Sequence, residues 1–241
     1  MSNNCILWLI PARSGSKSII DKNIKPLRGI PLFAYRYLSA CALDFKQKIW
    51  LSTDSEHYAN IGRSLGLDVP FMRPANLSGD ESTSNDVVLH AIKYAQEQDI
   101  NFEFIGLLEP TSPFIKSSHL KAALQILMKE SLSKSIVSTR VSRPNTAFIQ
   151  DDDNYLTSLY NSIKNTSVIS RQQFKNQITP SGGIYISRWE SFKIEKSFYT
   201  DTTLSFKVDD VAGLEIDEPL DWNLAEFYLK ENLVDLQTLC Q

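Results

Sequence analysis

Hydrophobic and polar positions alternate along the chain in blocks that predict strands and helices in turn. Short apolar runs between turn residues predict buried strands, and apolar residues spaced three and four apart predict helices. We expect strands at 5–11, 48–54, 69–74, 102–110, 133–141, 182–187 and 204–208. We expect helices at 30–43, 55–66, 84–98, 117–130 and 219–232. This alternation is typical of an α/β fold, in which a mostly parallel central sheet has helices on both faces.

Residues at the ends of the helical blocks support these boundaries. Pro31 suits a first helical turn, because its missing N–H has no partner there. Ser55 is a candidate N-cap, and Gly66 is a candidate stop for the same helix. For the helix over 84–98, either Ser84 or Asn85 is the expected cap.

The alternation breaks between 143 and 181, where the chain becomes polar and irregular. The run "DDDN" at 151–154 predicts a hairpin tip, and "TAFIQ" and "YLTSLYN" on either side of it predict short strands. We therefore expect one domain over 1–241, with 143–181 as an excursion from the main sheet. The short apolar runs of this excursion would be hard to bury in a monomer, which favours a two-fold homodimer.

Composition excludes several classes of protein. A length of 241 residues fits one large domain, and an apolar fraction of 42% is enough for a core. The net charge of -3 argues against a nucleic-acid binder. The opening "MSNNC" lacks the pattern of a signal peptide, and no apolar run approaches the about 20 residues of a membrane span. The expectation is a cytoplasmic protein that uses neither nucleic acid nor a membrane.

The cysteines and histidines predict neither disulfides nor a zinc site. Three widely spaced cysteines, Cys5, Cys41 and Cys240, fit a reducing compartment. No CxxC or His-rich spacing is present, and the three scattered histidines are expected at the surface or in satisfied positions.

The candidate site follows from the predicted sheet, because open parallel sheets bind ligands at the carboxyl ends of their strands. After the first strand, Arg13, Lys17 and Lys22 bring three cations into one loop. Near the other end of the chain, "GLEIDEPLDW" at 213–222 gathers carboxylates. A polyphosphate held by the cations, with a divalent metal joining it to the carboxylates, would use both groups.

The first loop alone leaves two interpretations open. It matches neither GxxxxGK[ST] nor GxGxxG, since Gly15 is its only glycine. A Gly–Ser turn that presents backbone N–H groups and two lysines could hold phosphate. Alternatively, it is a solvated turn whose lysines aid solubility.

Several blocks together carry a resemblance to a known family. They are "IPARSGSKSIIDKNIKPLRGIPLFAY", "STDSEHYANIGRSLG", "RPANLSGDEST", "LLEPTSPF", "RQQ", "PSGGIYI" and "LEIDEPLDW". In this order and spacing they are similar to blocks of the CMP-sialic acid synthetases, the acylneuraminate cytidylyltransferases, over nearly the whole chain. The resemblance implies a nucleotide-diphospho-sugar transferase-like fold. It also implies that CTP and a 2-keto sugar acid react, with attack of the anomeric hydroxyl on the α-phosphorus, to give a CMP-sugar and pyrophosphate.

The resemblance implies a role for each matching residue on the nucleotide side. Lys22 matches a lysine that stabilises the α-phosphate and the leaving oxygen, and the other residues expected to act in catalysis are Arg13, Lys17 and Asp217. The residues expected to bind the nucleotide are Ala12, Arg13, Ser16, Lys17, Asn23, Arg73, Ser82 and Ser84. The backbone from Ile10 to Ala12 is expected to read the cytosine edge.

The resemblance also implies a sugar site, a metal site and a partner subunit. Glu109, Arg171 and Tyr185 match sugar-binding positions, and Glu215 and Asp217 match the pair that binds Mg²⁺. In a strand-like segment residues i and i+2 point to the same side, so both carboxylates of this pair could reach one ion. In the family the excursion packs against a second subunit, which agrees with the expected homodimer.

The sequence departs from the best-known family pattern near the sugar. Glu109 stands where glutamine is common, and Thr179 and Ser181 stand where Arg and Asn are. Thr146 falls where some members have a lysine that crosses to the partner subunit. Glu215 replaces the more common Asp. The sugar acid is therefore left open among neuraminate, legionaminate, pseudaminate and other nonulosonates.

Other interpretations remain at this stage. The protein could be another sugar nucleotidyltransferase such as a CMP-Kdo synthetase, or a module that binds a nucleotide without turning it over. Glu215 and Asp217 could simply be carboxylates before a helix N-terminus. Glu109 could end its strand and pair structurally with Arg140 or Arg171. The general base and the number of metal ions are not identified by the sequence.

Overall fold

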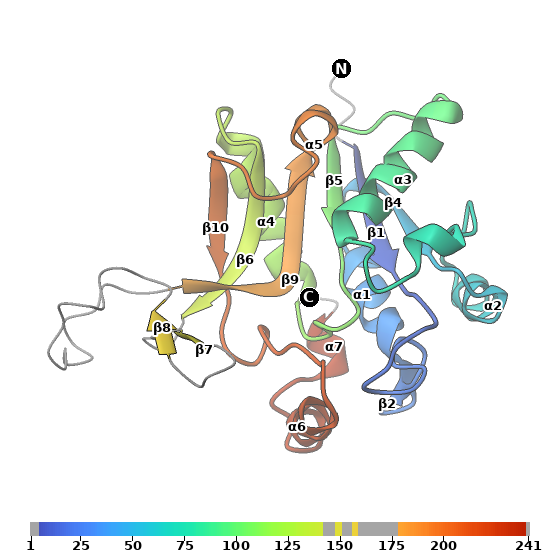
Figure 1. Cartoon of the computed structure of the whole chain (residues 1–241), viewed down its shortest axis with the longest axis vertical. Coiled ribbons are helices and arrows are strands. Elements are labelled where there is room, and N and C mark those ends of the chain that lie inside the picture. Colours follow the sequence, from blue (N-terminus) through green and yellow to red (C-terminus); the bar gives the residue numbers. More distant parts are fainter. Residues whose placement is uncertain (1–4, 142–147, 151–155, 159–177, 240–241) are drawn as a thin grey trace, which may run out of the picture.

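A six-stranded sheet forms the centre of the computed structural model, which describes residues 5–141, 148–150, 156–158 and 178–239 of the chain. The strand order across the sheet is β10-β6-β9-β5-β1-β4 (Figure 1). The strands are β1 (Cys5–Pro11), β4 (Lys46–Ser52), β5 (Phe104–Leu107), β6 (Ser135–Val141), β9 (Ile178–Arg188) and β10 (Thr203–Lys207). Only β9 runs against its neighbours in this sheet, so the expected mostly parallel sheet is confirmed.

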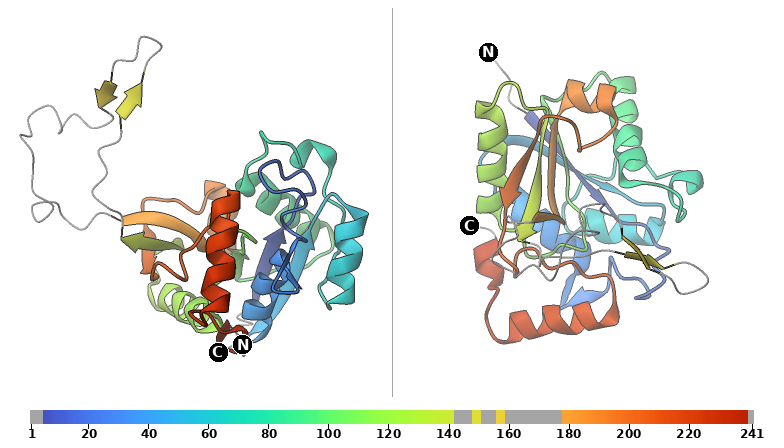
Figure 2. Two further views of the ribbon diagram at one scale, coloured as in Figure 1. Left: turned by 90° about the horizontal axis from the view of Figure 1, so that it is seen from below. Right: turned by 60° about the vertical axis from the view of Figure 1, so that its left-hand side comes forward.

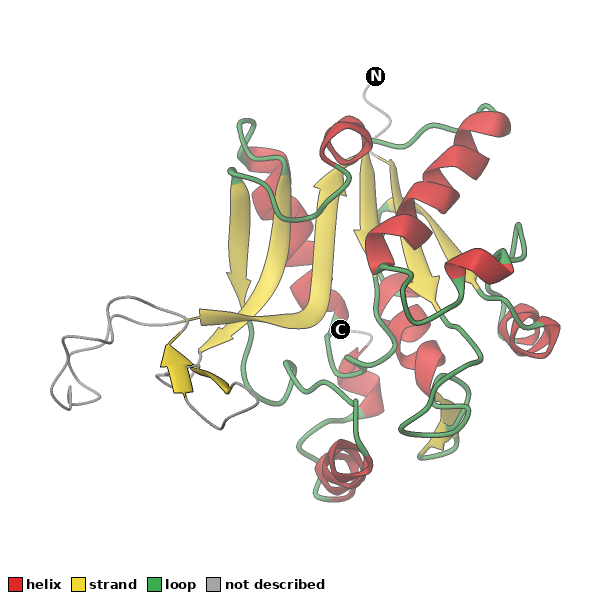
Figure 3. Ribbon diagram, in the orientation of Figure 1, coloured by secondary structure: helices red, strands yellow, loops and turns green. Residues whose placement is uncertain are grey.

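Helices cover both faces of the sheet, as expected for this fold class (Figure 3). They are α1 (Leu32–Cys41), α2 (Glu56–Ser64), α3 (Ser84–Glu97), α4 (Ser117–Lys129), α5 (Trp189–Glu195), α6 (Pro219–Lys230) and α7 (Leu236–Leu239). In Figure 1, α3 and α5 lie in front of the sheet, and α1 and α4 lie behind it. None of the described helices is long and apolar enough to cross a membrane.

The alternation of side chains along β1 explains why two cores form. Ile6, Trp8 and Ile10 pack with residues of α1 and α4, whereas Leu7 and Leu9 pack with residues of α3 and α5. Successive side chains of a strand point to opposite faces, so the sequence of a strand that is buried on both faces is one continuous apolar run. This is why the run "CILWLIP" predicts a central strand.

The strand expected over 69–74 is wrong. Asp68 makes only an isolated parallel bridge with Trp50, and the chain then continues as a loop to a short 3-10 helix at Ala75–Leu77. Pro70 and Pro74 have no N–H to donate to a neighbouring strand, which works against a strand here.

The cap expected for α3 also differs. Thr83, rather than Ser84 or Asn85, is the N-cap: its side chain accepts a hydrogen bond from the backbone N–H of Asp86, and the Asp86 carboxylate accepts one from the Thr83 N–H. This reciprocal arrangement is a capping box. Ser55 does cap α2, and Gly66 beyond its end has a positive φ, as expected.

The structure describes the C-terminal end of the expected excursion and two short strands within it. Residues 178–181 already belong to β9, where Ile178 pairs with Val141 of β6. β7 (Phe148–Gln150) and β8 (Leu156–Ser158) pair with each other in a small antiparallel sheet of their own. The expected hairpin tip at 151–154 lies outside the described residues.

The direction of the strands places the site. Since β4, β1, β5, β6 and β10 run the same way, the loops that follow them emerge at one edge of the sheet. The helix α6 lies at this edge, which faces the viewer in the left panel of Figure 2. The first loop and the acidic segment before α6 therefore meet, although they lie at opposite ends of the sequence.

Candidate active site

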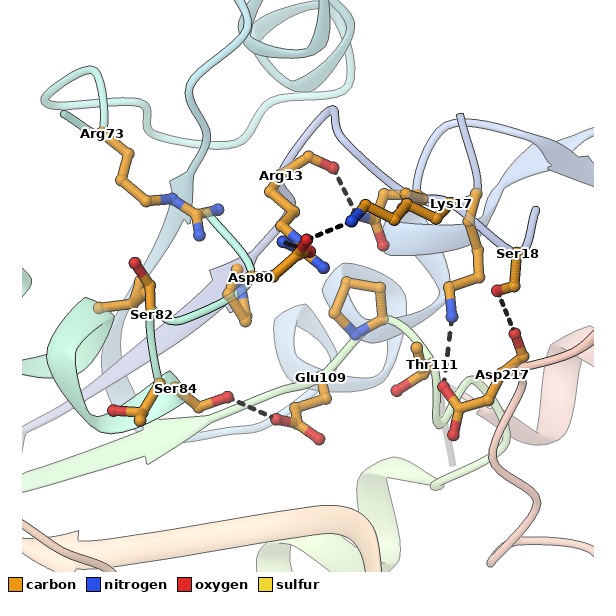
Figure 4. A pocket seen from close by; sticks show the side chains of 17 residues that line it. Arg13, Lys17, Ser18, Arg73, Asp80, Ser82, Ser84, Glu109, Thr111 and Asp217 are labelled. Atoms are coloured by element: carbon orange, nitrogen blue, oxygen red, sulfur yellow. Dashed lines mark hydrogen bonds and ion pairs between the residues drawn. The ribbon is translucent and has the colours of Figure 1, made fainter. Parts of the chain in front are cut away.

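A cavity of about 480 Å³ opens at the carboxyl edge of the sheet (Figure 4). Its lining comes from the loop after β1, from the segment that leads into α3, from residues after β5, and from Asp217 before α6. The lining residues are Pro11, Arg13, Ser16, Lys17, Ser18, Lys22, Asn23, Arg73, Asp80, Ser82, Thr83, Ser84, Val87, Glu109, Pro110, Thr111 and Asp217. The cavity thus brings together most of the residues that the sequence selected on the nucleotide side.

The turn after β1 is anchored by groups outside it. Asp54, just after β4, accepts hydrogen bonds from both the N–H and the hydroxyl of Ser14, each at 2.9 Å. The side-chain amide of Asn23 donates to the carbonyl oxygen of Arg13 at 2.9 Å. Asn23 therefore shapes the turn as well as lining the cavity. Sequence reasoning did not assign this positioning role to Asp54.

Asp80 bridges the two outer cations of this turn. Its carboxylate lies 2.8 Å from the Arg13 guanidinium and 2.5 Å from the Lys17 ammonium (Figure 4). Hydrogen bonds from Lys17 and then Arg13 hold the pKa of Asp80 below its ordinary value. Sequence reasoning missed Asp80, since 67 residues separate it from Arg13 and no local spacing signals the pairing.

Lys22 joins the first loop to the acidic segment. Its side chain is only 11% exposed, and its ammonium donates to the carbonyl oxygen of Ile216 at 2.8 Å and to the Asp217 carboxylate at 3.2 Å. The hydroxyl of Ser18 donates to the carbonyl oxygen of Asp217. Lys22 is thus a nearly buried cation whose position is fixed by backbone and side-chain oxygens at the cavity wall.

Arg73 is a second buried cation of the wall. Its guanidinium donates to the carbonyl oxygen of Ser52, at the end of β4, at 2.6 Å. Burial lowers the pKa of Arg73 to about 10, although the charge of Asp54 opposes this shift. The Nε of Arg73 has no hydrogen-bond partner within the described part of the chain. Arg73 nevertheless lines the cavity, so its guanidinium can present a donor to a polar ligand group.

The remaining nucleotide-side residues fall in different places. Ser82 and Ser84 line the cavity, as expected. Ala12 is fully buried, its N–H donates to the carbonyl oxygen of Ser52 at 2.9 Å, and its side chain is not part of the lining.

Glu109 is a half-buried carboxylate of the cavity. It follows β5 and accepts a hydrogen bond from the Ser84 hydroxyl at 2.9 Å (Figure 4). Burial raises the pKa of Glu109, the charges of Glu215 and Asp217 add to this shift, and the charge of Arg36 opposes it. Arg140, one of the two partners considered from the sequence, instead acts on Glu215. The other, Arg171, lies outside the described residues.

Glu215 lies beside β9 rather than in the cavity lining. A Cβ placed on Gly182 would come within 2.6 Å of a Glu215 carboxylate oxygen, and Gly182 has a φ of +56°. Glycine is favoured in this backbone conformation, and here the absence of a Cβ also leaves room for the carboxylate. Burial raises the pKa of Glu215, with additions from Asp217 and Asp221.

The segment that holds Glu215 and Asp217 is not a strand. The chain over 214–217 is irregular, and the N–H of Ile216 between them donates to the carbonyl oxygen of Thr111 at 2.7 Å. The segment is therefore not a strand of the sheet, although its burial alternates, with Leu214 and Ile216 buried and Glu215 and Asp217 more exposed. Asp217 lines the cavity and Glu215 does not, although the charge of Asp217 helps to raise the pKa of Glu215. Within the described ranges, no group of three or more His, Cys, Asp or Glu side chains could by itself hold a metal ion.

Tyr185 lies behind Glu109 on β9. It pairs in register with Leu107 of β5, and its ring packs against Phe198 and Tyr199, with centroids 5.4 Å and 6.2 Å away. Burial raises the pKa of Tyr185, and the nearby charge of Glu109 raises it further. Tyr185 is not part of the cavity lining, but its aromatic cluster is close enough to Glu109 to form an adjoining wall.

A family model described as cytidylyltransferase matches residues 7–231. This chain belongs to the cytidylyltransferase family. The family resemblance seen in the sequence is therefore confirmed, over almost the whole chain. The cavity at the carboxyl edge of the sheet is the candidate active site of this cytidylyltransferase.

The names of the relatives of this cytidylyltransferase refer to different sugar acids. The N-acylneuraminate cytidylyltransferase of Escherichia coli O18:K1:H7 is 30% identical over 91% of the chain and 51% of that relative. The CMP-N,N'-diacetyllegionaminic acid synthase of Legionella pneumophila is 30% identical over 94% of the chain and 97% of the relative. The pseudaminic acid cytidylyltransferase of Campylobacter jejuni is 33% identical over 64% of the chain and 66% of the relative. The chain thus spans about half the length of the first relative and nearly all of the second.

Solved structures support the fold. CMP:2-keto-3-deoxy-manno-octonic acid synthetase in complex with CTP superposes with a TM-score of 0.68 at 14% identity, covering 94% of this chain and 99% of that one. The 4-diphosphocytidyl-2C-methyl-D-erythritol synthase of Anaerococcus prevotii superposes with a TM-score of 0.62 at 15% identity, covering 95% and 100%. At these identities the likeness concerns the fold alone.

Replacing Glu109 with Gln should raise the melting temperature at neutral pH, and the gain should shrink as the pH falls. Burial raises the folded-state pKa above the ordinary value of 4.5, so the unfolded chain binds fewer protons between the two pKa values. Stability from this group is therefore lost as the pH rises through that range. Glutamine carries no charge and still offers Ser84 an acceptor oxygen.

Thermal melts from pH 4.5 to neutrality would measure this difference, with Glu81→Gln as the control at an exposed carboxylate. A lower melting temperature for Glu109→Gln at neutral pH would contradict the prediction. It would mean that the charge of Arg36 outweighs the cost of burying the Glu109 carboxylate.

Proposed function

We propose that the protein transfers the cytidylyl group of CTP to a nonulosonic, sialic-acid-like sugar acid, giving a CMP-sugar and pyrophosphate. The observation that carries this proposal is one cavity that combines the cations Arg13, Lys17 and Lys22 with the carboxylates Glu109 and Asp217. The cations suit a triphosphate, and the carboxylates suit the hydroxyl and N–H groups of a sugar and a divalent ion. The relatives named for neuraminate, legionaminate and pseudaminate support the same reaction class.

In the proposed reaction the phosphates lie along the turn after β1. Arg13 and Lys17 reach into the cavity from this turn, which Asp54 and Asn23 hold in shape. The hydroxyl of Ser16 is a further donor to phosphate oxygens. Because Asp54 and Asn23 anchor the backbone of this turn, little backbone reorganisation is needed when charge develops on the leaving pyrophosphate.

Lys22 is the cation proposed for the reacting end of the triphosphate. It is held at the cavity wall between the first loop and Asp217, and its ammonium is nearly buried. A buried cation acts more strongly on nearby charge than an exposed one, since water screens it less. We assign Lys22 to the α-phosphate and the leaving oxygen, where negative charge grows in the transition state.

Arg73, Ser82 and Ser84 are assigned to the nucleoside. All three line the cavity, where Arg73 offers a guanidinium and the two serines offer hydroxyls. The backbone from Ile10 to Ala12, at the end of β1, is proposed to form hydrogen bonds with the edge of the cytosine base. Its hydrogen bond to Ser52 fixes this backbone next to β4.

Glu109 and Tyr185 are proposed to form part of the sugar site. An ionised carboxylate offers acceptors only, so Glu109 would face hydroxyl or N–H donors of the sugar. The rings of Tyr185, Phe198 and Tyr199 give an apolar surface next to it, which suits an acyl group. Arg171, proposed to bind the sugar carboxylate, is one of the residues that the structure does not describe.

We also propose that Mg²⁺ assists at Asp217 and Glu215. The charge of Asp217 helps to raise the pKa of both Glu215 and Glu109, which indicates a concentration of negative charge that a cation would relieve. Two carboxylates do not make a complete cage, which fits Mg²⁺, because this ion keeps waters and shares phosphate oxygens. When bound, it would supply positive charge to the triphosphate.

The assay that tests the proposed function is release of pyrophosphate from CTP with Mg²⁺ and a panel of sugar acids. We expect turnover with one or more of N-acetylneuraminate, legionaminate and pseudaminate. Turnover with Kdo only would favour a CMP-Kdo synthetase instead. CTP binding without turnover on any sugar acid would favour a non-catalytic nucleotide-binding module.

Lys22→Ala should lower kcat more than it raises the KM for CTP. The expected loss in kcat is of order 10²-fold, as for removal of one preorganised charge stabiliser. Steady-state kinetics on Lys22→Ala and on Lys121→Ala, an exposed lysine of α4 away from the cavity, would measure it. An unchanged kcat with a higher KM would mean that Lys22 only binds the triphosphate.

Asp217→Asn should cost more activity than Glu215→Gln, and both should need more Mg²⁺. Asp217 lines the cavity and also holds Lys22, whereas Glu215 lies behind it. Titration of activity with Mg²⁺ in the two variants separates loss of the metal from loss of the Lys22 contact, since only the first is rescued by more metal. Near-normal titrations in both variants would place the metal on the triphosphate alone.

We further propose that the protein is a cytoplasmic homodimer whose excursion at 143–181 packs against the second subunit. The paired strands β7 and β8 form a small sheet of their own, which fits a segment that completes its packing elsewhere. Light scattering should give twice the chain mass of 27.3 kDa at micromolar concentration. A fully active monomer would refute the dimer.

A further inference from the structure

We propose that Asp80 acts as an internal competitor of the triphosphate: its carboxylate pairs with the cations Arg13 and Lys17 of the first loop and must leave them when CTP binds. The inference rests on the proposed CTP-dependent function and adds a residue that sets the affinity of the site for polyphosphates. Its basis is the bridging position of Asp80 between Arg13 and Lys17, at 2.8 Å and 2.5 Å.

The chemistry of the contact is that of a phosphate held by the same turn. A carboxylate presents two oxygens to two cationic donors, and each oxygen of Asp80 takes one of them. Phosphate oxygens make charge-assisted hydrogen bonds to Arg and Lys of the same kind and length. The two anions therefore compete for the same donors, and they cannot both hold Arg13 and Lys17 in this geometry.

Asp80 is placed where it can leave at little cost. The side chains of Asp80 and Lys17 are 52% and 79% exposed, and solvent-exposed ion pairs contribute little to stability. Asp80 also lies in a turn between the 3-10 helix and α3, so its movement would break no strand or helix. Lys22 and Arg73 differ, because backbone carbonyl oxygens hold both of them.

The competition has a direct consequence for substrate binding and product release. Any anion that uses Arg13 and Lys17 must first displace Asp80, so its affinity is lowered by the strength of the internal contact. Pyrophosphate formed in the reaction meets the same competitor, and return of Asp80 to the turn would assist its departure. Cytidine has no phosphate, so the affinity of the protein for cytidine should not depend on Asp80.

Asp80→Asn removes the charge of the competitor while keeping its shape. Glu81→Gln is the matched control, because it removes the same charge one residue away, from an exposed side chain outside the cavity lining. Each variant removes one negative charge, so the two change the long-range electrostatic potential at the cavity to a similar extent. Salt also screens this potential over about 10 Å at ordinary ionic strength. The difference between them isolates the contact of Asp80 with Arg13 and Lys17.

Calorimetric titrations with tripolyphosphate, CTP, pyrophosphate and cytidine would measure the effect. Relative to Glu81→Gln, Asp80→Asn should bind the three polyphosphate ligands about three- to tenfold more tightly, as expected for loss of two exposed ion pairs. Binding of cytidine should be unchanged. In turnover, Asp80→Asn should be inhibited by lower concentrations of pyrophosphate.

The outcomes separate this inference from the proposed function. Equal affinities of wild type and both variants for tripolyphosphate would overturn the competitor role while leaving the CTP-dependent function intact. Weaker binding by Asp80→Asn would also overturn it, and would mean that Asp80 orients the two cations for the ligand. Failure of wild type and variants alike to bind CTP would instead refute the proposed function.

Discussion

The common direction of five strands is the constraint on which the site depends. Because β4, β1, β5, β6 and β10 all end at one edge, the cationic loop after β1 and the acidic segment after β10 are forced together there. The antiparallel strand β9 adds its beginning to the same edge, which brings Gly182 against Glu215. Charges of opposite sign therefore meet at a surface that each element alone would leave exposed to water.

The charges at this edge are balanced in two different ways, and the difference suits a binding site. Lys22 and Arg73 are buried and donate to backbone carbonyl oxygens, so their positions follow from the fold. Arg13 and Lys17 are more exposed and meet only the movable carboxylate of Asp80 among the contacts that the structure gives their charged groups. Fixed cations can stabilise charge that develops during a reaction, whereas cations with a movable partner can be transferred to a ligand. One cavity thus offers both functions.

The sequence predicts local features of this arrangement well and long-range pairings poorly. Apolar periodicity is a local property, so it identifies the central strand at 5–11 and the five longer helices. It failed at 69–74, where Pro70 and Pro74 interrupt an apolar run that would otherwise suit a strand. The cations of the first loop could be found from their spacing after a strand. Asp80 and Asp54 could not, because their contacts with that loop depend on the tertiary fold.

The cavity wall at Glu109 is influenced by a buried charge that the sequence did not single out, that of Arg36. Arg36 of α1 is fully buried and donates to the carbonyl oxygen of Gly183 in β9 at 2.6 Å. Burial lowers the pKa of Arg36 to about 9, so it remains a cation at neutral pH, and its charge partly offsets the cost of burying Glu109. The charge of Glu109 in turn opposes the lowering of the Arg36 pKa, so each of the two charges reduces the cost of burying the other. An ionised Glu109 presents acceptors only, so the ligand groups that suit this wall are hydrogen-bond donors.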